Sequence, residues 1–122
     1  MTGEIEVASA FLRALEAAAE TGDREGVYPF LAPDVEWVNP RRTLRGLDEV
    51  QTDLTWVEPA EHFDVEFEQG EWTELGEGRL ACEVRHLYRW KQTGELAHER
   101  RRRIELTVRR AKISRYEMRV VG

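Results

Sequence analysis

The sequence predicts a single α+β domain in which about three N-terminal helices pack on a curved, mostly antiparallel β-sheet that encloses a pocket. Three observations support this fold class. Hydrophobic residues recur with a helical period early in the chain, they alternate with a period of two later, and one long amphipathic helix is available to cover the sheet. The 122 residues are enough for one hydrophobic core, so one domain is expected over positions 1–122.

The first helix is predicted from Glu4 to Glu20. Its hydrophobic residues recur at steps of three and four, and they are Ile5, Ala8, Phe11, Leu12, Leu15 and Ala19. Gly22 suits the left-handed position after a helix, and Asp23 suits the N-cap of a second, short helix over about 24–31.

A short strand and a third helix follow. Val35, Trp37 and Asn39 alternate with Glu36 and Val38 until Pro40, which predicts a short strand that ends there. Residues 41–45 read as a polar loop. The third helix is expected to begin at Gly46-Leu47-Asp48, with Leu47, Val50, Leu54 and Val57 at helical spacing, and to end at Pro59.

The rest of the chain alternates with a period of two and predicts a series of β-hairpins. The expected strands cover about 63–68, 80–90, 95–109 and 113–121, with turns at 76–78, 92–94 and 110–111. Strands of this length coil, and a helix laid across a coiled sheet leaves a hollow at the open end. That hollow is the expected binding site.

Charge and composition exclude several functions. The net charge of −6 argues against binding to nucleic acid or anionic lipid, and no apolar run is long enough for a membrane span, so a cytoplasmic protein is expected. Cys82 is interpreted as buried filler rather than a reactive thiol. The histidines lack ligand-like spacing and no phosphate-binding loop is present, so neither a metal nor another cofactor is implied.

The order of elements resembles that of a known superfamily. The residues that carry this resemblance are Gly22-Asp23, the run from Leu31 to Trp37, Asn39-Pro40 and Gly46-Leu47. Together they resemble the nuclear transport factor 2-like superfamily, and within it the SnoaL-like polyketide cyclases, ketosteroid isomerases and limonene epoxide hydrolases. The resemblance covers nearly the whole chain and implies a cystatin-like cone.

The resemblance also locates positions at which relatives keep catalytic groups. The isomerases' general base falls at Asn39, and their oxyanion-binding tyrosine falls near Phe11. The arginine and the two aspartates of the epoxide hydrolases fall at Val84, His86 and Met118. An amide has no useful basicity, and Met118 is apolar, so the relatives' proton-transfer schemes do not transfer intact.

His86 interrupts an apolar stripe at a position that points into the cavity in relatives. One hypothesis makes it a general base, with Asn39 and Tyr116 orienting a ligand carbonyl. The alternative is a core histidine without chemistry. The predicted ligand contacts come from hydrophobic and aromatic side chains, which could equally be core filling: Phe11, Trp37, Trp56, Phe63, Phe67, Val84, Tyr88, Trp90 and Met118.

Arg100 and Arg102 share one face of their strand. They could meet an anionic substrate group if that face is concave, or they could belong to a solvated outer strand paired with acidic neighbours.

Two classes of function remain open from the sequence. One is a cofactor-independent cyclase, isomerase or hydratase acting on a hydrophobic carbonyl compound, polyketide-like or steroid-like. The other is a non-catalytic binding or dimerisation module of the same fold. The expected partners are a small hydrophobic ligand and, from the resemblance, a second copy of the chain in a homodimer.

Overall fold

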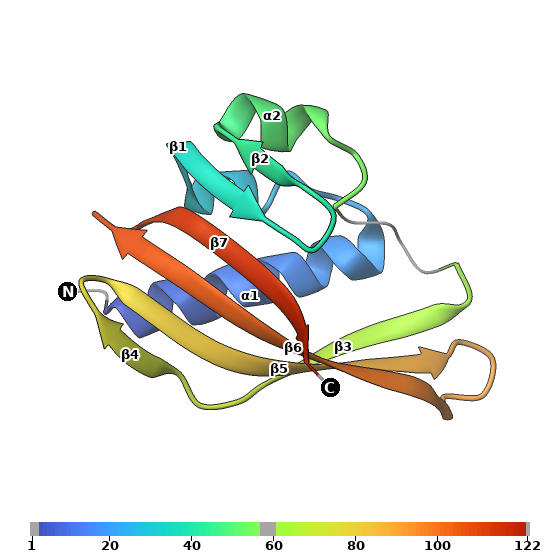
Figure 1. Cartoon of the computed structure of the whole chain (residues 1–122). Helices are drawn as coiled ribbons and strands as arrows, with labels where there is room; N and C mark the ends of the chain where they lie inside the picture. Colours follow the sequence, from blue (N-terminus) through green and yellow to red (C-terminus); the bar gives the residue numbers. More distant parts are fainter. Residues whose placement is uncertain (1–2, 57–60, 122) are drawn as a thin grey trace.

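One long helix and one strongly curved sheet form the two layers of the structure (Figure 1). The computed structural model describes residues 3–56 and 61–121. The helices are α1 (Glu4–Thr21), the 3-10 turn η1 (Tyr28–Phe30) and α2 (Leu47–Thr52). The strands are β1 (Leu31–Val38), β2 (Thr43–Arg45), β3 (Phe63–Gln69), β4 (Thr73–Gly76), β5 (Arg79–Trp90), β6 (Leu96–Arg109) and β7 (Lys112–Val121).

The sheet is almost entirely antiparallel. Six strands follow the order β2-β1-β7-β6-β5-β3, and β4 pairs with the beginning of β5. Among the described strands, the one parallel pairing joins β1 to β7 and brings Trp37 opposite Tyr116. The predicted α+β class and the mostly antiparallel sheet are therefore confirmed.

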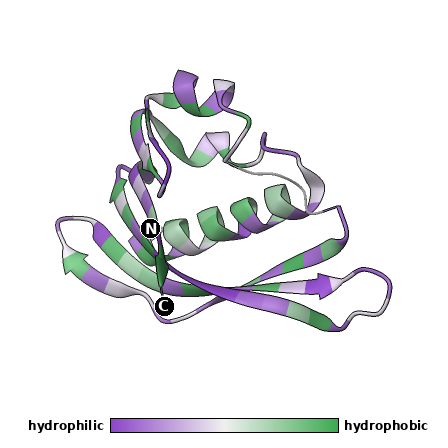
Figure 2. Cartoon of the chain, turned by 45° about the vertical axis from the view of Figure 1, so that its right-hand side comes forward, coloured by the Kyte–Doolittle hydropathy of each residue, from purple (hydrophilic) through white to green (hydrophobic). Residues whose placement is uncertain are grey.

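Helix α1 lies across the concave side of the sheet because one of its faces is apolar. Phe11, Leu12 and Ala18 on this face are fully buried, and hydrophobic residues recur along α1 in Figure 2. Gly22 ends the helix in the left-handed conformation, with φ 78°, and its N–H donates to the carbonyl of Ala18, as the sequence predicted. Neither described helix combines the length and the hydrophobicity that a membrane span requires.

The long β5–β6 and β6–β7 hairpins confirm the predicted alternation. On β5, Cys82, Val84 and His86 are buried while Glu83 and Arg85 are exposed. The β6–β7 turn lies at Arg110 and Ala111, which both have positive φ, 50° and 64°. Two such residues in succession are typical of the tight hairpin turn that matches strand twist.

The helix count differs from the prediction, with two α-helices described rather than three. Residues 25–27 form turns, Tyr28–Phe30 form the single turn η1 and Leu31 begins β1, because Pro29 has no backbone N–H with which to continue α-helical hydrogen bonding. Here Val27 and Phe30 donate to carbonyls three residues back, those of Arg24 and Val27.

The third predicted helix is shorter than expected. Helix α2 ends at Thr52, and the Asp53 side chain then accepts hydrogen bonds from the N–H and hydroxyl of Thr55. This local bonding competes with helix continuation. Leu54 is consequently exposed, and Val57 and Pro59 lie outside the described residues.

Two short strands were not predicted from the sequence. Residues 43–45 form β2, which pairs with β1 through Trp37 and Leu44. Residues 73–76 form β4, which pairs with β5 next to a register shift. Both are brief and mostly exposed, so they lack the long alternation that identified the other strands.

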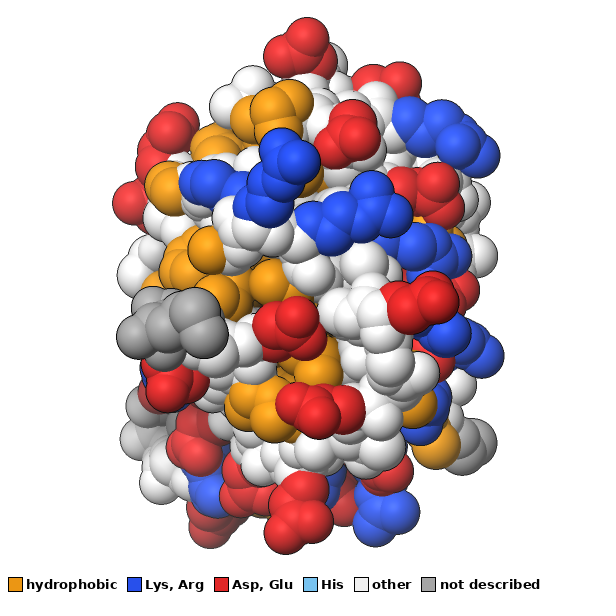
Figure 3. Space-filling model, turned by 90° about the vertical axis from the view of Figure 1, so that its left-hand side faces the viewer, with side chains coloured by type: hydrophobic (Ala, Val, Ile, Leu, Met, Phe, Trp, Pro, Cys, Tyr) orange, Lys and Arg blue, Asp and Glu red, His pale blue; other side chains and the backbone are white. Residues whose placement is uncertain are grey.

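The outer face of the sheet carries a charge ladder, which we define as the cross-strand ion pairs of Arg85, Arg89, Arg115 and Arg119 with glutamates of neighbouring strands. Arg85, for example, contacts Glu68 on β3 and Glu99 on β6. Basic and acidic side chains are also interspersed on the left-hand side of the molecule, which faces the viewer in Figure 3. Opposite charges across strands stabilise their pairing modestly and keep this face well hydrated.

Candidate functional site

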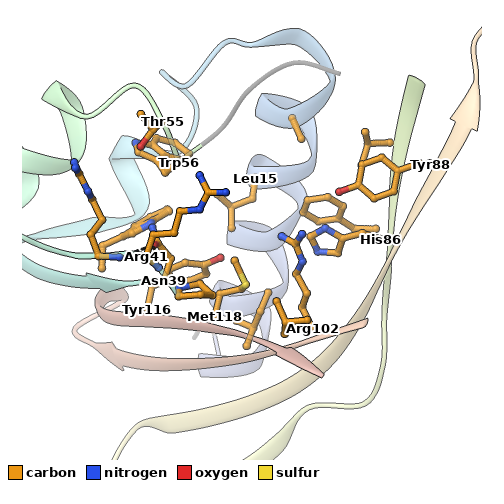
Figure 4. A pocket seen from close by; sticks show the side chains of 18 residues that line it. Leu15, Asn39, Arg41, Thr55, Trp56, His86, Tyr88, Arg102, Tyr116 and Met118 are labelled. Carbon is orange, nitrogen blue, oxygen red and sulfur yellow. Dashed lines mark hydrogen bonds between the residues drawn. The ribbon is translucent and has the colours of Figure 1, made fainter. Parts of the chain in front are cut away.

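A pocket lies between α1 and the concave side of the sheet and has a volume of about 700 Å³ (Figure 4). This volume lies within the usual range for small-molecule sites. The described residues that line it are Leu15, Ala19, Trp37, Asn39, Pro40, Arg41, Arg42, Thr55, Trp56, Val65, Phe67, His86, Tyr88, Arg102, Ile104, Tyr116, Met118 and Val120.

One wall of the pocket is aromatic. The Trp37 ring lies 4.3 Å from the Tyr116 ring and 4.9 Å from the Trp56 ring, measured between centroids. Phe11 packs edge-on against Trp37 and Tyr116 from behind. Trp56 is fixed by a 2.9 Å hydrogen bond from its Nε1 to the carbonyl of Val50. The planes of Tyr116 and Trp56 are inclined to that of Trp37 by 38° and 52°, so the three rings form an aromatic wall with several faces on which a ring of a ligand could stack.

His86 lies on the opposite wall. Its ring stacks on Phe67, its partner across β3 and β5, with centroids 4.1 Å apart and planes inclined by 16°. The residue is 7% exposed, and its Nε2 has no hydrogen-bond partner in the described part of the chain. A buried imidazole nitrogen without a partner is unusual and leaves bonding capacity unused.

The environment of His86 keeps its ring neutral. Burial, together with the nearby positive charge of Arg102, lowers the pKa of His86 from 6.5 to about 4. Burial also raises the pKa of the Tyr116 phenol, although the charge of Arg102 partly opposes that effect. At neutral pH both side chains are uncharged, and both feel the charge of Arg102.

Asn39 has a structural role at the edge of the pocket. Its Oδ1 accepts hydrogen bonds from the backbone N–H groups of Arg41 and Arg42, each 3.0 Å long. This arrangement turns the chain directly after β1. The carboxamide oxygen is thus engaged, and only the Nδ2 group is left to donate to a ligand.

Three arginines reach the pocket, whereas none of the described lining residues is acidic. Arg42 forms an ion pair with Asp53, which lies outside the lining. Arg102 is half-buried, and its Nε is buried with no hydrogen-bond partner among the described residues. Arg41 and Arg102 come from different elements in Figure 4. The pocket therefore combines aromatic and aliphatic walls with polar groups, and every charged side chain among its described lining residues is basic.

Four of the residues predicted to contact a ligand lie outside the pocket lining. Phe11 and Val84 are fully buried in the core beneath it. Phe63 and Trp90 pack together near the far end of the β5–β6 hairpin, with centroids 4.6 Å apart, and Trp90 is 45% exposed. Strands β5 and β6 extend past the end of α1 (Figure 1). A residue on the inner face of the sheet therefore lines the pocket only if it also lies along the part of the strand that α1 covers.

The other predicted positions do line the pocket: His86, Asn39, Tyr116, Trp37, Trp56, Phe67, Tyr88 and Met118. The structure also separates the two candidate arginines, since Arg102 lines the pocket and Arg100 is exposed. The parity that Arg102 shares with the buried Ile104 was the sequence signal that it faces inward, but Arg100 has the same parity, so the sequence could not separate the two arginines. Arg41 and Arg42 had no such signal, because their placement depends on the turn made by Asn39.

Solved structures with the same architecture identify the fold. An NTF2-like protein from Anabaena variabilis superposes with a TM-score of 0.78 and 18% identity, covering 100% of this chain and 95% of that one. The chain has the nuclear transport factor 2-like fold. The predicted resemblance to nuclear transport factor 2-like proteins is therefore confirmed for the fold. The sequence matches no protein-family profile and no curated protein.

Other proteins of the nuclear transport factor 2-like fold have been solved with small molecules. A protein from Catenulispora acidiphila with a ketosteroid isomerase-like fold, in complex with trimethylamine, aligns at TM-score 0.64 and 13% identity over 89% of this chain and 83% of that one. TerC, co-crystallised with polyporic acid, aligns at TM-score 0.66 and 22% identity over 94% and 91%. At these identities the likeness concerns the fold alone.

Proposed function

We propose that this protein binds a small, flat, predominantly hydrophobic carbonyl compound, polyketide-like or steroid-like, in the pocket under α1. The observation that carries the proposal is the aromatic wall formed by Trp37, Trp56 and Tyr116 in a cavity of about 700 Å³. Aromatic faces favour planar ligands through stacking, and the few polar groups fix their orientation. The co-crystallisation of TerC with polyporic acid supports the same use of the fold.

Tryptophan fluorescence offers a direct test because Trp37 and Trp56 line the pocket, whereas Trp90 lies outside its lining. A neutral anthraquinone and a neutral steroid are titrated into the protein. We expect saturable quenching that is reduced in Trp56→Phe and retained in Trp90→Phe, whose side chain lies at the hairpin end. The rise in melting temperature on addition of the ligand should likewise be smaller in Trp56→Phe than in Trp90→Phe. Quenching that is equal in both variants would place binding elsewhere.

General-base catalysis by His86 is a second candidate function, in a cofactor-independent cyclase or isomerase. The specific observation in its favour is the unpartnered Nε2 of a neutral ring that lines the pocket. The Nδ2 of Asn39 and the hydroxyl of Tyr116 would donate to the substrate carbonyl. A pKa of about 4 makes the ring a weak base in the ligand-free protein, so binding is the better supported function.

The catalytic candidate is tested with any carbonyl compound that binds in the fluorescence titration. His86→Gln keeps a polar side chain of similar size and removes the titrating group. Turnover by the unaltered protein and its loss in His86→Gln, with binding retained, would support catalysis. Binding without turnover would establish a non-catalytic module.

A homodimer remains a proposal that derives from the family resemblance. The charge ladder on the outer sheet face offers both signs of charge and could pair with a second copy. Sedimentation equilibrium measures the mass directly. A dimer disrupted by Arg85→Glu would support this face, and a monomer at all concentrations would refute it.

A further inference from the structure

The pocket holds a cation whose charge no described residue balances. Arg102 lies on the inner face of β6 between Val84 on β5 and Val120 on β7. Its Nε is buried without a hydrogen-bond partner, and none of the described carboxylates lies within ion-pair distance of it. A guanidinium remains charged at every physiological pH, and a partly desolvated charge is costly unless an anion compensates for it.

The neighbouring arginine on the outer face of β6 shows what Arg102 lacks. Arg103 contacts Glu105, which also contacts Arg119 on the adjacent strand. Acidic residues are thus plentiful on the outer face, yet the described pocket lining contains none. The inner position therefore has a permanent positive charge, an apolar surrounding and an open cavity in front of it.

A second polar group with unused bonding capacity lies beside this arginine. The Arg102 guanidinium and the His86 imidazole are neighbours in Figure 4, and the pKa of His86 responds to the charge of Arg102. The Glu16 carboxylate on α1 accepts a hydrogen bond from the backbone N–H of Phe67, the residue whose ring stacks on His86. The other titratable or charged groups on the elements around His86 are Tyr88, His98, Arg100 and Tyr116.

We propose that the ligand of this pocket is a flat aromatic or polycyclic molecule bearing one anionic group, and that this group binds to Arg102 beside His86. The proposal rests on the small-molecule binding proposed above and adds the charge of the ligand and its orientation. The aromatic wall would hold the rings, while the guanidinium would donate charge-assisted hydrogen bonds to the anion. Arg41, at the edge of the pocket, adds positive potential that attracts such a ligand.

Occupation of this position changes the acid-base chemistry of His86. Because the charge of Arg102 contributes to the low pKa of His86, an anion that neutralises this charge raises that pKa. Binding of a permanently charged anion should therefore be accompanied by proton uptake at a pH somewhat above 4. The ligand would thereby make His86 a more effective base.

A pair of isosteric probes tests the charge preference. Naphthalene-2-sulfonate is anionic throughout the accessible pH range, and naphthalene-2-sulfonamide is neutral at pH 7 and nearly identical in shape. We expect the wild-type protein to bind the sulfonate about tenfold more tightly or better, as measured by calorimetry at low salt. Equal affinity for the two probes would overturn the proposal.

Variants of two adjacent arginines locate the anion. Arg102→Met should abolish the preference for the sulfonate and leave sulfonamide affinity unchanged or higher. Arg101→Met removes the same charge from the next residue, which is exposed and faces outward, and should retain the preference. Arg102→Lys keeps the positive charge and should retain part of the preference for the sulfonate. If both methionine variants behave alike, the anion does not bind at Arg102.

Proton uptake provides a measurement that needs no folded Arg102 variant. Calorimetric titration of the wild-type protein with the sulfonate at pH 5.5, in buffers of different ionisation enthalpy, counts the protons taken up. We expect uptake in the wild-type protein and none in His86→Gln, with uptake retained in His62→Gln, because His62 is exposed. Absence of uptake in the wild-type protein would exclude an anion beside His86.

The two proposals fail in different ways. If neither probe binds, the small-molecule function itself is wrong. If the neutral sulfonamide binds and quenches Trp56 but the sulfonate has no advantage, the function stands and only the anionic ligand is refuted.

Discussion

Replacement of His86 should change how the stability of the protein depends on pH. In the unfolded chain the imidazole titrates near 6.5, whereas burial and Arg102 lower its pKa to about 4 in the folded protein. The unfolded state therefore binds more protons between these values, so stability is fully present above pH 6.5 and is lost as the pH falls toward 4. The difference of about 2.5 in pKa corresponds to about 3 kcal/mol in total, of which about 2 kcal/mol is lost between pH 7.5 and pH 5.

Urea denaturation followed by far-ultraviolet circular dichroism at pH 7.5, 6.5, 5.5 and 5 measures this slope. His86→Gln should remove most of the loss, whatever its effect on stability at pH 7.5. His62→Gln serves as the control and should leave the slope unchanged, because His62 is exposed. A wild-type slope that persists in His86→Gln would show that the ring is not held neutral by the fold.

Three further predictions test the packing, two by pairs of substitutions and one by thiol labelling. Phe11→Ala should lower the free energy of unfolding by about 3–5 kcal/mol, because the ring is fully buried. Trp90→Ala, at the exposed end of the hairpin, should lower it far less. Urea denaturation measures the free energy of unfolding of both variants. Gly78→Ala should destabilise the protein by at least about 1 kcal/mol, since φ is 77° and the new Cβ would lie 2.5 Å from the backbone oxygen of Val108 on β6. Gly26→Ala is the control and should be tolerated, because the added Cβ meets no atom within 4 Å. Equal melting temperatures of the two variants would contradict this prediction. Cys82 should react with a thiol reagent much more slowly in the folded protein than in urea, because burial raises the pKa of its thiol; rapid labelling of the native protein would refute its burial.

Long patterns in the sequence were sufficient to predict the main elements of the fold. The apolar face of α1, the left-handed Gly22 and the alternation through β5, β6 and β7 each act locally, so they can be recognised without tertiary information. The short elements were not predictable in this way. The segment before β1 is held by single turns around Pro29, and α2 is cut short by the side chain of Asp53.

The candidate site was only partly predictable for a different reason. Period-two alternation tells which face of the sheet a side chain occupies, and it placed Tyr88 and Trp90 on the same face. It does not tell how far along the strand the pocket extends, so Trp90 was included although it lies beyond the lining. The contribution of Arg41 depends on the turn formed by Asn39, and such turns are decided by hydrogen bonds that the sequence does not order uniquely.

The parallel pairing of β1 with β7 has a consequence for how the protein folds. The hydrogen bond from Arg115 to Glu36 on these strands closes a sequence separation of 79 residues, whereas the β5–β6 and β6–β7 hairpins need only short loops. Closing a long loop carries a greater entropic cost, so this pairing is expected to follow formation of the hairpins. Trp37 and Tyr116 meet only through this pairing, and the aromatic wall is therefore a late product of folding that no isolated hairpin can reproduce.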